Sequence, residues 1–266
     1  MTSKRPVVLT IAGSDPSGGA GIQADLKTFH QHGVYGMSAI TLLTVQNTMR
    51  VSRVVPMEPG LVAEQIAACL EDIPPDAIKL GALGSASIVR AVAEALRDYR
   101  GPIVIDPVMV SKHGHALIDD DAVEACTTLL FPRAELVTPN VPEALRLLPT
   151  ESERGASQGE MAKSLARTFS VNVLLKGGHL EGARAVDILA TKSGDLAHFS
   201  APRIDTTHTH GTGCTFAAAI AARLAQGLLL EEAIQHAKEW LTRALREAPQ
   251  LGLGIGPVSH FAPLND

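Results

Sequence analysis

The chain has few of the residues that would point to an oxidising compartment or to a nucleic acid. Its 266 residues include only three cysteines, far apart in the sequence, and 3% aromatic residues. Three scattered cysteines exclude a disulfide framework and favour a reducing cytoplasm. The scarcity of aromatic residues argues against a surface on which nucleic-acid bases stack.

Long hydrophobic runs and clusters of basic charge are missing as well. No apolar stretch approaches the ~20 residues that span a membrane, and residues 1–6 are too short and polar for a signal peptide. The net charge is −5 without any run of Lys and Arg, so we expect no nucleic-acid partner. A hydrophobic content of 45% with 19% charged residues is typical of a soluble globular protein with a sizeable core.

Short runs rich in Val, Ile and Leu alternate with longer helical patterns, which predicts an α/β fold with a mostly parallel sheet. No linker or repeat interrupts this alternation, so we expect one domain over residues 1–266. The expected strands are Val7–Ala12, Ser38–Val45, Ala77–Leu80, Ile103–Ile105, Leu136–Thr138 and Val173–Leu175, with a hairpin of Ala185–Ala190 and Leu196–Ala201. The expected helices are Gly19–His30, Leu61–Glu71, Ala86–Arg97, Asp121–Leu130, Val141–Leu147, Gln158–Thr168, Thr215–Gln226 and Leu230–Glu247.

The segment from Thr209 to Cys214, THGTGC, runs directly into one of these helices. Its two glycines allow the backbone to turn tightly and to approach a ligand closely. The first N–H groups of a helix have no intrahelical partner and, with the helix dipole, form a site for an anion such as phosphate. Cys214 lies at this site, where the helix N-terminus is expected to lower the pKa of its thiol. A tight turn that binds nothing is the alternative.

Other polar residues follow the expected strands, at the edge of the sheet where ligands bind in open parallel sheets. A glycine-rich turn, Gly13 to Gly21, follows the first strand but lacks the Lys-Ser/Thr of a P-loop, and Asp25 lies in the next helix. Gln46 follows the second strand, and its carboxamide suits the edge of a heterocycle. A long turn and a polar strand end are the structural alternatives.

Three later strands are also followed by polar residues: Asp106, the pair Asn140 and Glu143, and Lys176. Asn140 is placed to cap a helix, with Glu143 one turn further on. A carboxylate beside phosphate usually needs a cation, and Mg²⁺ prefers oxygen ligands. Lys176, next to two glycines, is placed to meet a phosphate as a point charge. Helix-dipole stabilisation of the Glu and a basic turn are the alternatives.

Histidine and the remaining cysteines give weaker signals. Two His-x-His pairs, His113/His115 and His208/His210, make zinc an alternative, because in a strand this spacing directs both rings to one side. No fourth ligand is placed beside either pair. Cys69 and Cys126 lie in helical apolar patterns and are expected in the core.

Taken together, these motifs resemble a known family. Residues 11–29, IAGSDPSGGAGIQADLKTF, strongly resemble the N-terminus of the hydroxymethylpyrimidine/phosphomethylpyrimidine kinases, the bifunctional kinases of thiamine biosynthesis. Further motifs match in the same order over nearly the whole chain: Gln46–Thr48, Asp106–Met109, Thr138–Asn140, Leu175–His179, Phe199–Arg203, Thr209–Thr215 and Gly254–Val258.

The resemblance implies a ribokinase-like, three-layer α/β/α fold, ATP and Mg²⁺ as cofactors, and a homodimer. It implies phosphorylation of 4-amino-5-hydroxymethyl-2-methylpyrimidine to its monophosphate and then to the pyrophosphate. The pyrimidine site implied is Gly13, Asp25, Thr44, Gln46, Ala82 and Val108. Cys214 is implied as the base, beside an anion hole of Gly211, Thr212 and Gly213. ATP is implied to bind Lys176, Asn140, Asp106, Thr209 and Thr138, with Mg²⁺ at Glu143 and Asp106.

The chain departs from the family pattern at Ala82, where some members carry Met, at Thr44, where some carry Val, and at His208, where Asn is common. Because Ala82 leaves a roomier pocket, a pyridoxal kinase of the same fold is the main alternative. A cysteine hydrolase with Cys214 as nucleophile and His210 as base, and a nucleotide-binding module without turnover, are alternatives from other classes. The His113-Gly114-His115 stretch is the expected flap over ATP.

Overall fold

The computed structural model describes residues 5–109, 118–148, 150, 155–178 and 182–264. These residues form a single nine-stranded sheet in the order β3-β2-β1-β4-β5-β6-β7-β8-β9. Strands β2, β1, β4, β5, β6 and β7 run parallel, and β3, β8 and β9 extend the two edges as antiparallel strands. The bounds are β1 (Val7–Ser14), β2 (Tyr35–Asn47), β3 (Arg50–Pro56), β4 (Ala77–Leu80), β5 (Ile103–Ile105), β6 (Leu136–Val137), β7 (Val173–Leu175), β8 (Arg184–Ala190) and β9 (Leu196–Pro202).

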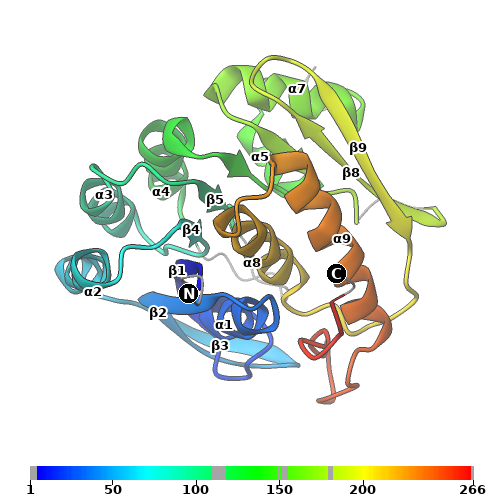
Figure 1. Ribbon diagram of the computed structural model, residues 1–266, viewed down its shortest axis with the longest axis horizontal. Coiled ribbons are helices and arrows are strands. Elements are labelled where there is room, and N and C mark those ends of the chain that lie inside the picture. Colours follow the sequence, from blue (N-terminus) through cyan, green and yellow to red (C-terminus); the bar gives the residue numbers. More distant parts are fainter. Residues whose placement is uncertain (1–4, 110–117, 149, 151–154, 179–181, 265–266) are drawn as a thin grey trace.

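Helices cover both faces of the sheet, which confirms the predicted three-layer α/β/α arrangement (Figure 1). One face packs against α2 (Pro59–Asp72), α3 (Ala86–Ala95), α4 (Asp120–Ala125), α5 (Val141–Leu147) and α7 (Gln158–Phe169). The other face packs against α1 (Gly21–Gln31), α8 (Thr212–Ala225) and α9 (Leu230–Arg246). A π-helical turn (Cys126–Leu130) and a 3₁₀ turn (Phe131–Arg133) continue α4.

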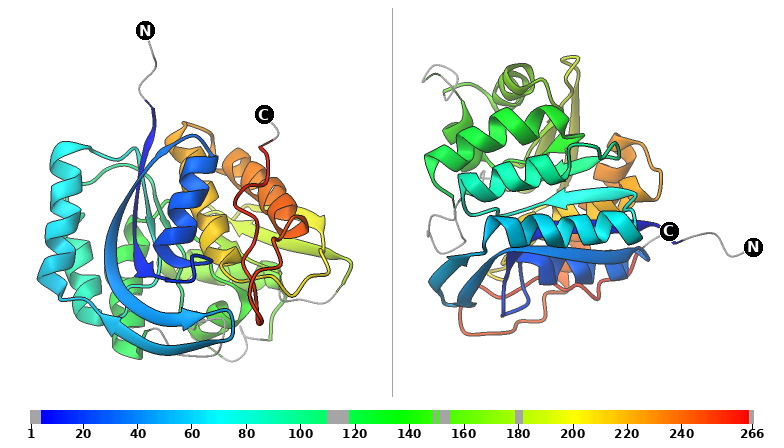
Figure 2. Two further views of the ribbon diagram at one scale, coloured as in Figure 1. Left: turned by 90° about the horizontal axis from the view of Figure 1, so that it is seen from below. Right: turned by 90° about the vertical axis from the view of Figure 1, so that its left-hand side faces the viewer.

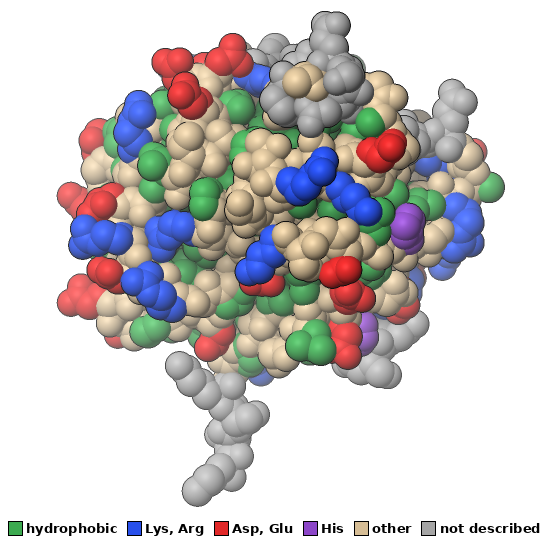
Figure 3. Space-filling model, turned by 90° about the horizontal axis from the view of Figure 1, so that it is seen from above, with side chains coloured by type: hydrophobic (Ala, Val, Ile, Leu, Met, Phe, Trp, Pro, Cys, Tyr) green, Lys and Arg blue, Asp and Glu red, His purple; other side chains and the backbone are tan. Residues whose placement is uncertain are grey.

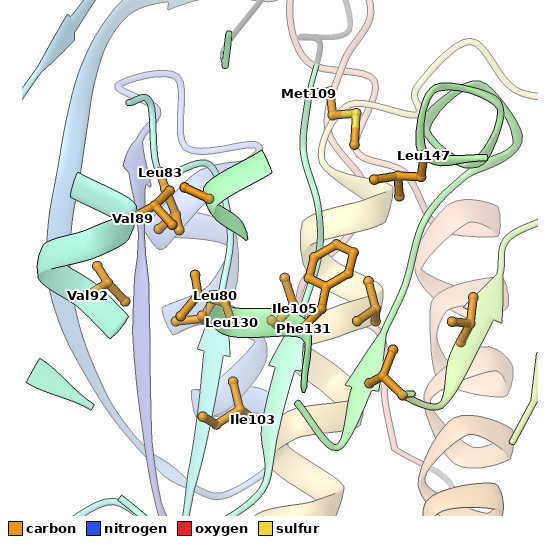
Figure 4. Packing of buried hydrophobic residues seen from close by; sticks show 14 of the residues in the cluster. Leu80, Leu83, Val89, Val92, Ile103, Ile105, Met109, Leu130, Phe131 and Leu147 are labelled. Carbon is orange, nitrogen blue, oxygen red and sulfur yellow. The ribbon is translucent and has the colours of Figure 1, made fainter. Parts of the chain in front are cut away.

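Successive side chains of each parallel strand pack into two different hydrophobic cores, one on each face of the sheet, because a strand directs its side chains alternately to opposite faces. In β1, Leu9 and Ile11 belong to the core beneath α2 and α3, whereas Val8 belongs to the core beneath α8 and α9. Figure 4 shows the first core, in which Leu80 of β4 lies on the side of the sheet where Val89 of α3 packs. This two-sided burial explains why the strands read as continuous apolar runs.

Helix α8 lies between the sheet and α9, and its residues 217–222 are fully buried. Five of these six residues are alanines, which allow the helix axis to come close to both neighbours. The chain runs outward from β1 to β2 and β3, and it then crosses back to β4 on the other side of β1. The strand order therefore reverses at β1. Ligands bind at such a switch point, outside the carboxyl ends of the strands.

All the predicted strands and the β8–β9 hairpin are present, but several boundaries were wrong. Strand β2 extends through Asn47, so Gln46 lies within the strand and not after it. Helix α1 begins at Gly21 instead of Gly19, and α8 begins at Thr212 instead of Thr215. The latter shift places Thr212, Gly213 and Cys214 in the first helical turn, because Gly211 with φ +76° already ends the turn.

Strand β3 was not predicted. Its sequence RVSRVVP carries two arginines and a proline, and only Val51 is buried, because β3 is an edge strand that pairs on one side. Figure 2 shows β2 and β3 as a long, curved ribbon at this edge. The proposed flap and the pair His113/His115 lie outside the described residues.

The surface shows no segregation of charge on the face drawn in Figure 3, where acidic and basic side chains are interspersed. In the part of the chain that the structure describes, no helix has the length and apolar character needed to cross a membrane.

The close packing of α8 can be tested by substitution. In Ala218→Leu the added methyl groups have no space, so we expect a loss of ~1–3 kcal/mol in the free energy of unfolding in urea. Ala225→Leu makes the same change on the same helix where the residue is only partly buried, and it should cost less. Equal losses in the two variants would contradict the packing described.

Candidate active site

A cavity of about 720 Å³ lies along the carboxyl ends of the parallel strands and the N-terminus of α8. A volume of this size falls within the ~300–1,000 Å³ of small-molecule sites. Most of the predicted site residues line it together: Gly13, Thr44, Gln46, Ala82, Asp106, Val108, Asn140, Glu143, Lys176, Thr209, Gly211, Thr212, Gly213 and Cys214. Asp25 and Thr138 do not line it and are fully buried beneath it.

The N-terminus of α8 forms one wall of the cavity. Gly211 adopts a left-handed conformation, and a Cβ there would collide with the carbonyl oxygen of Gly19. Thr212, Gly213 and Cys214 follow in the first turn, where backbone N–H groups lack intrahelical acceptors. A Cβ on Gly213 would lie 3.3 Å from the Asp106 carboxylate and 3.4 Å from the Lys176 ammonium. The first-turn amides and the Lys176 ammonium therefore border the same small space, which suits an anion, with the Asp106 carboxylate alongside.

Cys214 does not have the acidified thiol that the sequence suggested. Burial raises the pKa of the half-buried Cys214 thiol to about 11, although the Lys79 ammonium and the Gly21 N–H both act to lower it. The prediction was wrong because loss of water around a thiolate outweighs the field of the helix N-terminus here. Burial also raises the pKa values of Cys69 and Cys126, which are partly buried and pack against the edge of the first core instead of lying inside it.

Lys176 and Asp106 form an ion pair beside the first turn of α8, with Nζ 2.7 Å from Oδ1. Burial alone would lower the pKa of Lys176, but the Asp106 and Glu143 carboxylates raise it, so the ammonium stays charged. Thr138 donates a hydrogen bond to Asp106 from below, at 3.3 Å, which explains its distance from the cavity. Thr138 therefore holds Asp106 in place and does not reach the cavity, where the sequence predicted that it would contact ATP.

Asn140 caps α5, as the sequence suggested, and Glu143 completes a capping box with it. The Asn140 side chain accepts from the Glu143 N–H at 2.9 Å, and the Glu143 carboxylate accepts from the Asn140 N–H at 2.8 Å. Burial raises the pKa of Glu143 to about 7, against the opposing charge of Lys176 and with a further increase from Asp106. A cation at this wall would relieve that unfavourable burial of negative charge.

The other end of the cavity is lined by Gly13, Thr44, Gln46, Ala82 and Val108. The Thr44 hydroxyl donates to the carbonyl of Ser14 at 2.9 Å and so ties β2 to the end of β1. The Gln46 carboxamide makes no hydrogen bond within the described residues, which leaves its paired donor and acceptor available to a ligand. This end combines apolar walls with one free amide, as a heterocycle requires.

Asp25 binds Lys79, a residue that the sequence reading missed. Lys79 Nζ lies 2.9 and 3.1 Å from the two Asp25 oxygens, and Thr10 donates to Asp25 at 2.6 Å. Burial alone would lower the pKa of Lys79, yet the Asp25 carboxylate holds it above its ordinary value. Lys79 lines the cavity above Asp25. The available signal was a lysine inside the buried strand Ala77–Leu80, because such a charge is rarely buried without a partner.

A second missed pair supports the Lys176 wall. Lys238 of α9 lies 2.6 Å from Asp187 of β8, and Asp187 also accepts the Gly177 N–H at 2.9 Å. Both side chains are buried and line the cavity. Asp187 thus fixes the turn that begins at Lys176.

The structure opposes two of the alternatives. His210, the base of the hydrolase alternative, places Nε2 2.8 Å from the Asp15 carboxylate, and it makes no hydrogen bond to Cys214. Among the described residues, no group of three His, Cys, Asp or Glu side chains is arranged to hold a metal ion, and the His210 ring is bound to Asp15.

The first-turn amides of α8 and the Lys176–Asp106 pair lie together at the switch point of a parallel sheet, an arrangement that suits a kinase acting on a small molecule. A family model described as phosphomethylpyrimidine kinase matches residues 15–259. The chain belongs to the phosphomethylpyrimidine kinase family.

Individual relatives agree with this family. The chain is 47% identical to the hydroxymethylpyrimidine/phosphomethylpyrimidine kinase of Salmonella typhimurium, over 95% of this chain and 96% of that protein. It is 51% identical to the thiamine biosynthesis bifunctional protein ThiED of Geobacter sulfurreducens, over 98% of this chain but only 54% of that longer protein. The ADP complex of Bacillus subtilis pyridoxal kinase superposes with a TM-score of 0.87 at 36% identity, over 97% of this chain and 98% of the other.

The Lys79–Asp25 pair predicts a specific stability pattern. Lys79→Met leaves the Asp25 charge buried without its partner and should cost ~3–5 kcal/mol in urea unfolding. Lys79→Met/Asp25→Leu removes both charges and should be more stable than the single variant. A double variant that is no more stable than Lys79→Met would show that charge compensation is not what the pair provides.

Glu143 predicts a pH dependence of stability. Its folded pKa of about 7 exceeds the unfolded value of ~4.3, so the native state binds more protons between these pH values. The contribution of this group to stability therefore falls as pH rises through that window. With a chelator present, Glu143→Gln should lose less stability than the wild type between pH 5 and 8. Glu160→Gln, the same change in the capping box of α7, should match the wild type, because hydrogen bonds from Ser157 lower the pKa of Glu160.

Proposed function

We propose that this protein uses ATP to phosphorylate 4-amino-5-hydroxymethyl-2-methylpyrimidine to its monophosphate, and then to the pyrophosphate, in thiamine biosynthesis. The observation that carries the proposal is the anion hole of α8 facing the Lys176–Asp106 pair, with Gly213 against both side chains. Membership of the phosphomethylpyrimidine kinase family supports the choice of acceptor.

The two ends of the cavity take different parts of the reaction. The end with Gly13, Gln46 and Val108 would hold the pyrimidine, with the Gln46 carboxamide on its polar edge. The opposite end would hold ATP, whose phosphates would meet Lys176 and the Gly211–Cys214 amides, close to Asn140 and Thr209. Asp25, which lies below the cavity, would support the pyrimidine site through Lys79 and not by direct contact.

The carboxylates fit Mg²⁺. Mg²⁺ that accompanies ATP is usually bound through one or two carboxylates together with the phosphates. Asp106 and Glu143 supply two such groups at the ATP end, and burial has raised the pKa of Glu143 to about 7, as expected where a cation is needed. When bound there, the ion would offset phosphate charge.

The catalytic contribution of the chain is positioning and charge stabilisation. The first-turn amides of α8 would hold the charge that develops on the transferring phosphoryl group, and loss of one such donor costs roughly 10²–10³-fold in rate. Cys214 is the proposed proton acceptor for the hydroxymethyl group. A thiol with a pKa of about 11 is rarely ionised near neutral pH, but its thiolate, once formed, is a correspondingly stronger base.

We also propose a homodimer, a single kinase domain over residues 1–266 and a cytoplasmic location. Exposed apolar side chains on the β2–β3 ribbon support the dimer: Leu43, Val45, Met49 and Val55. The one continuous sheet supports the single domain. Free thiols at the three cysteines fit a reducing compartment.

Pyridoxal kinase is the second candidate, because pyridoxal kinase of Bacillus subtilis is a close structural neighbour and Ala82 contributes only a methyl group to the acceptor end. Product formation, resolved by mass, separates the candidates when the pyrimidine, its monophosphate and pyridoxal are offered separately with ATP and Mg²⁺. We expect both the mono- and the pyrophosphate of the pyrimidine. Turnover of pyridoxal alone would refute the proposal.

Removal of the Cys214 thiol tests its role. Cys214→Ala should fold and should lose roughly 10²–10⁴-fold in the rate of the first phosphorylation. The second acceptor is already a phosphate oxygen and needs no strong base, so the second step should lose less. Cys69→Ala removes a thiol remote from the cavity and should keep full activity. Equal losses in both steps would assign Cys214 to positioning, and full activity of Cys214→Ala would remove it from catalysis.

A further inference from the structure

His210 joins two sequence motifs that the proposed function leaves without a role. One is the turn that begins at Asp15, and the other is the C-terminal segment Gly254–Val258. His210 itself directly precedes Gly211 of the anion hole, so whatever holds His210 also holds the start of α8.

Asp15 gathers donors from its own turn and from His210. Its Oδ1 accepts from the Ser17 N–H and hydroxyl, at 2.8 and 2.7 Å. Its Oδ2 accepts from the N–H groups of Gly19 and Ala20, at 3.2 and 2.8 Å, and lies 2.8 Å from His210 Nε2. Although burial acts to raise it, the hydrogen bonds from His210 and Ser17 hold the pKa of Asp15 below its ordinary value. An ionised carboxylate only accepts hydrogen bonds, so His210 donates from Nε2.

The backbone around His210 is equally constrained. Its N–H donates to the Gly256 carbonyl at 3.0 Å, and the neighbouring Ile255 N–H donates to Thr48 at 2.8 Å, at the end of the ribbon that carries Gln46. A Cβ on Gly19 would collide with the His210 ring, so the turn packs directly on this side chain. The amide of Gly21, at the end of the same turn, acts to lower the pKa of the Cys214 thiol, so the turn ends beside this sulfur.

We propose that Asp15 and His210 are positioning residues for phosphoryl transfer. Their hydrogen bond, here called the clasp, holds the turn at residues 15–21 against the anion hole and thereby fixes both the first-turn amides and the Cys214 sulfur relative to the acceptor. The inference rests on the proposed function, since the clasp acts on that reaction. Because a misplacement of ~1 Å in an active site can cost ~10²-fold in rate, the clasp affects kcat.

Two replacements of His210 separate its hydrogen bond from its volume. His210→Phe keeps a ring and removes the donor, whereas the side-chain amide of His210→Gln reaches the position of Nε2 and can donate to Asp15. We expect kcat for the hydroxymethylpyrimidine to fall roughly 10–100-fold in the Phe variant, as for other supporting residues. The KM for ATP should change less, and the Gln variant should regain most of the loss. Wild-type kcat in His210→Phe, or equal losses in the Phe and Gln variants, would overturn the proposal.

A double-mutant cycle tests whether the two residues act as a unit. Asp15→Asn/His210→Phe should lose no more kcat than the worse of the two single variants, because either change already opens the clasp. Losses that multiply would show that the residues act independently. His198→Phe, at an exposed histidine of β9, is the matched control and should behave as the wild type.

Hydrogen exchange followed by mass spectrometry gives a readout without substrate. His210→Phe should raise exchange in residues 15–21, 209–214 and 252–258 and leave α3 unchanged. A uniform rise over the chain would indicate general destabilisation and would overturn the clasp. If the wild type fails to phosphorylate the pyrimidine, the proposed function fails, while this local exchange pattern still decides whether the clasp exists.

Discussion

A helix leaves its first backbone N–H groups without partners, and the site of this protein depends on where α8 delivers those groups. The alanine-rich middle of α8 fixes the helix between the sheet and α9. Gly211 permits the entry turn, and the missing side chain of Gly213 leaves room for Asp106 and Lys176. These amides are suited to bind a ligand anion. The packing of α8 in the core therefore decides where in the cavity such an anion can bind.

Charge in and beneath the cavity is arranged in pairs. Lys79 binds Asp25, Lys176 binds Asp106 and Lys238 binds Asp187, and each pair is largely removed from water. Pairing is necessary because an isolated buried charge destabilises the fold by several kcal/mol. Removal of one partner from a buried pair typically costs roughly 3–5 kcal/mol. Pairing also means that none of these three lysines offers its full charge to phosphate. The backbone amides, with a cation at Asp106 and Glu143, therefore carry much of the neutralisation in the proposed reaction.

The layout of the fold could be predicted because it depends on local pattern. Strands buried on both faces are largely apolar, with Lys79 in β4 as an exception, and the apolar runs identified every parallel strand. The edge strand β3 escaped prediction because pairing on one side allows it to keep arginines and a proline. Helix starts at glycine, such as Gly21 and Gly211, were misplaced because glycine gives little local signal of where a helix begins.

The sequence alone determined which polar residues would gather at one site: the motif ending in Cys214, Gln46, Asp106, Asn140 with Glu143, and Lys176 all line one cavity. Only the tertiary structure decided their surroundings. It buried Asp25 below the cavity with Lys79 bound to it, placed His210 against Asp15, and raised the pKa of Cys214 where the sequence suggested a lower one. The reason is that burial and charge pairing depend on residues distant in the chain. A motif specifies which groups are present, but their ionisation is set by the segments that fold against them.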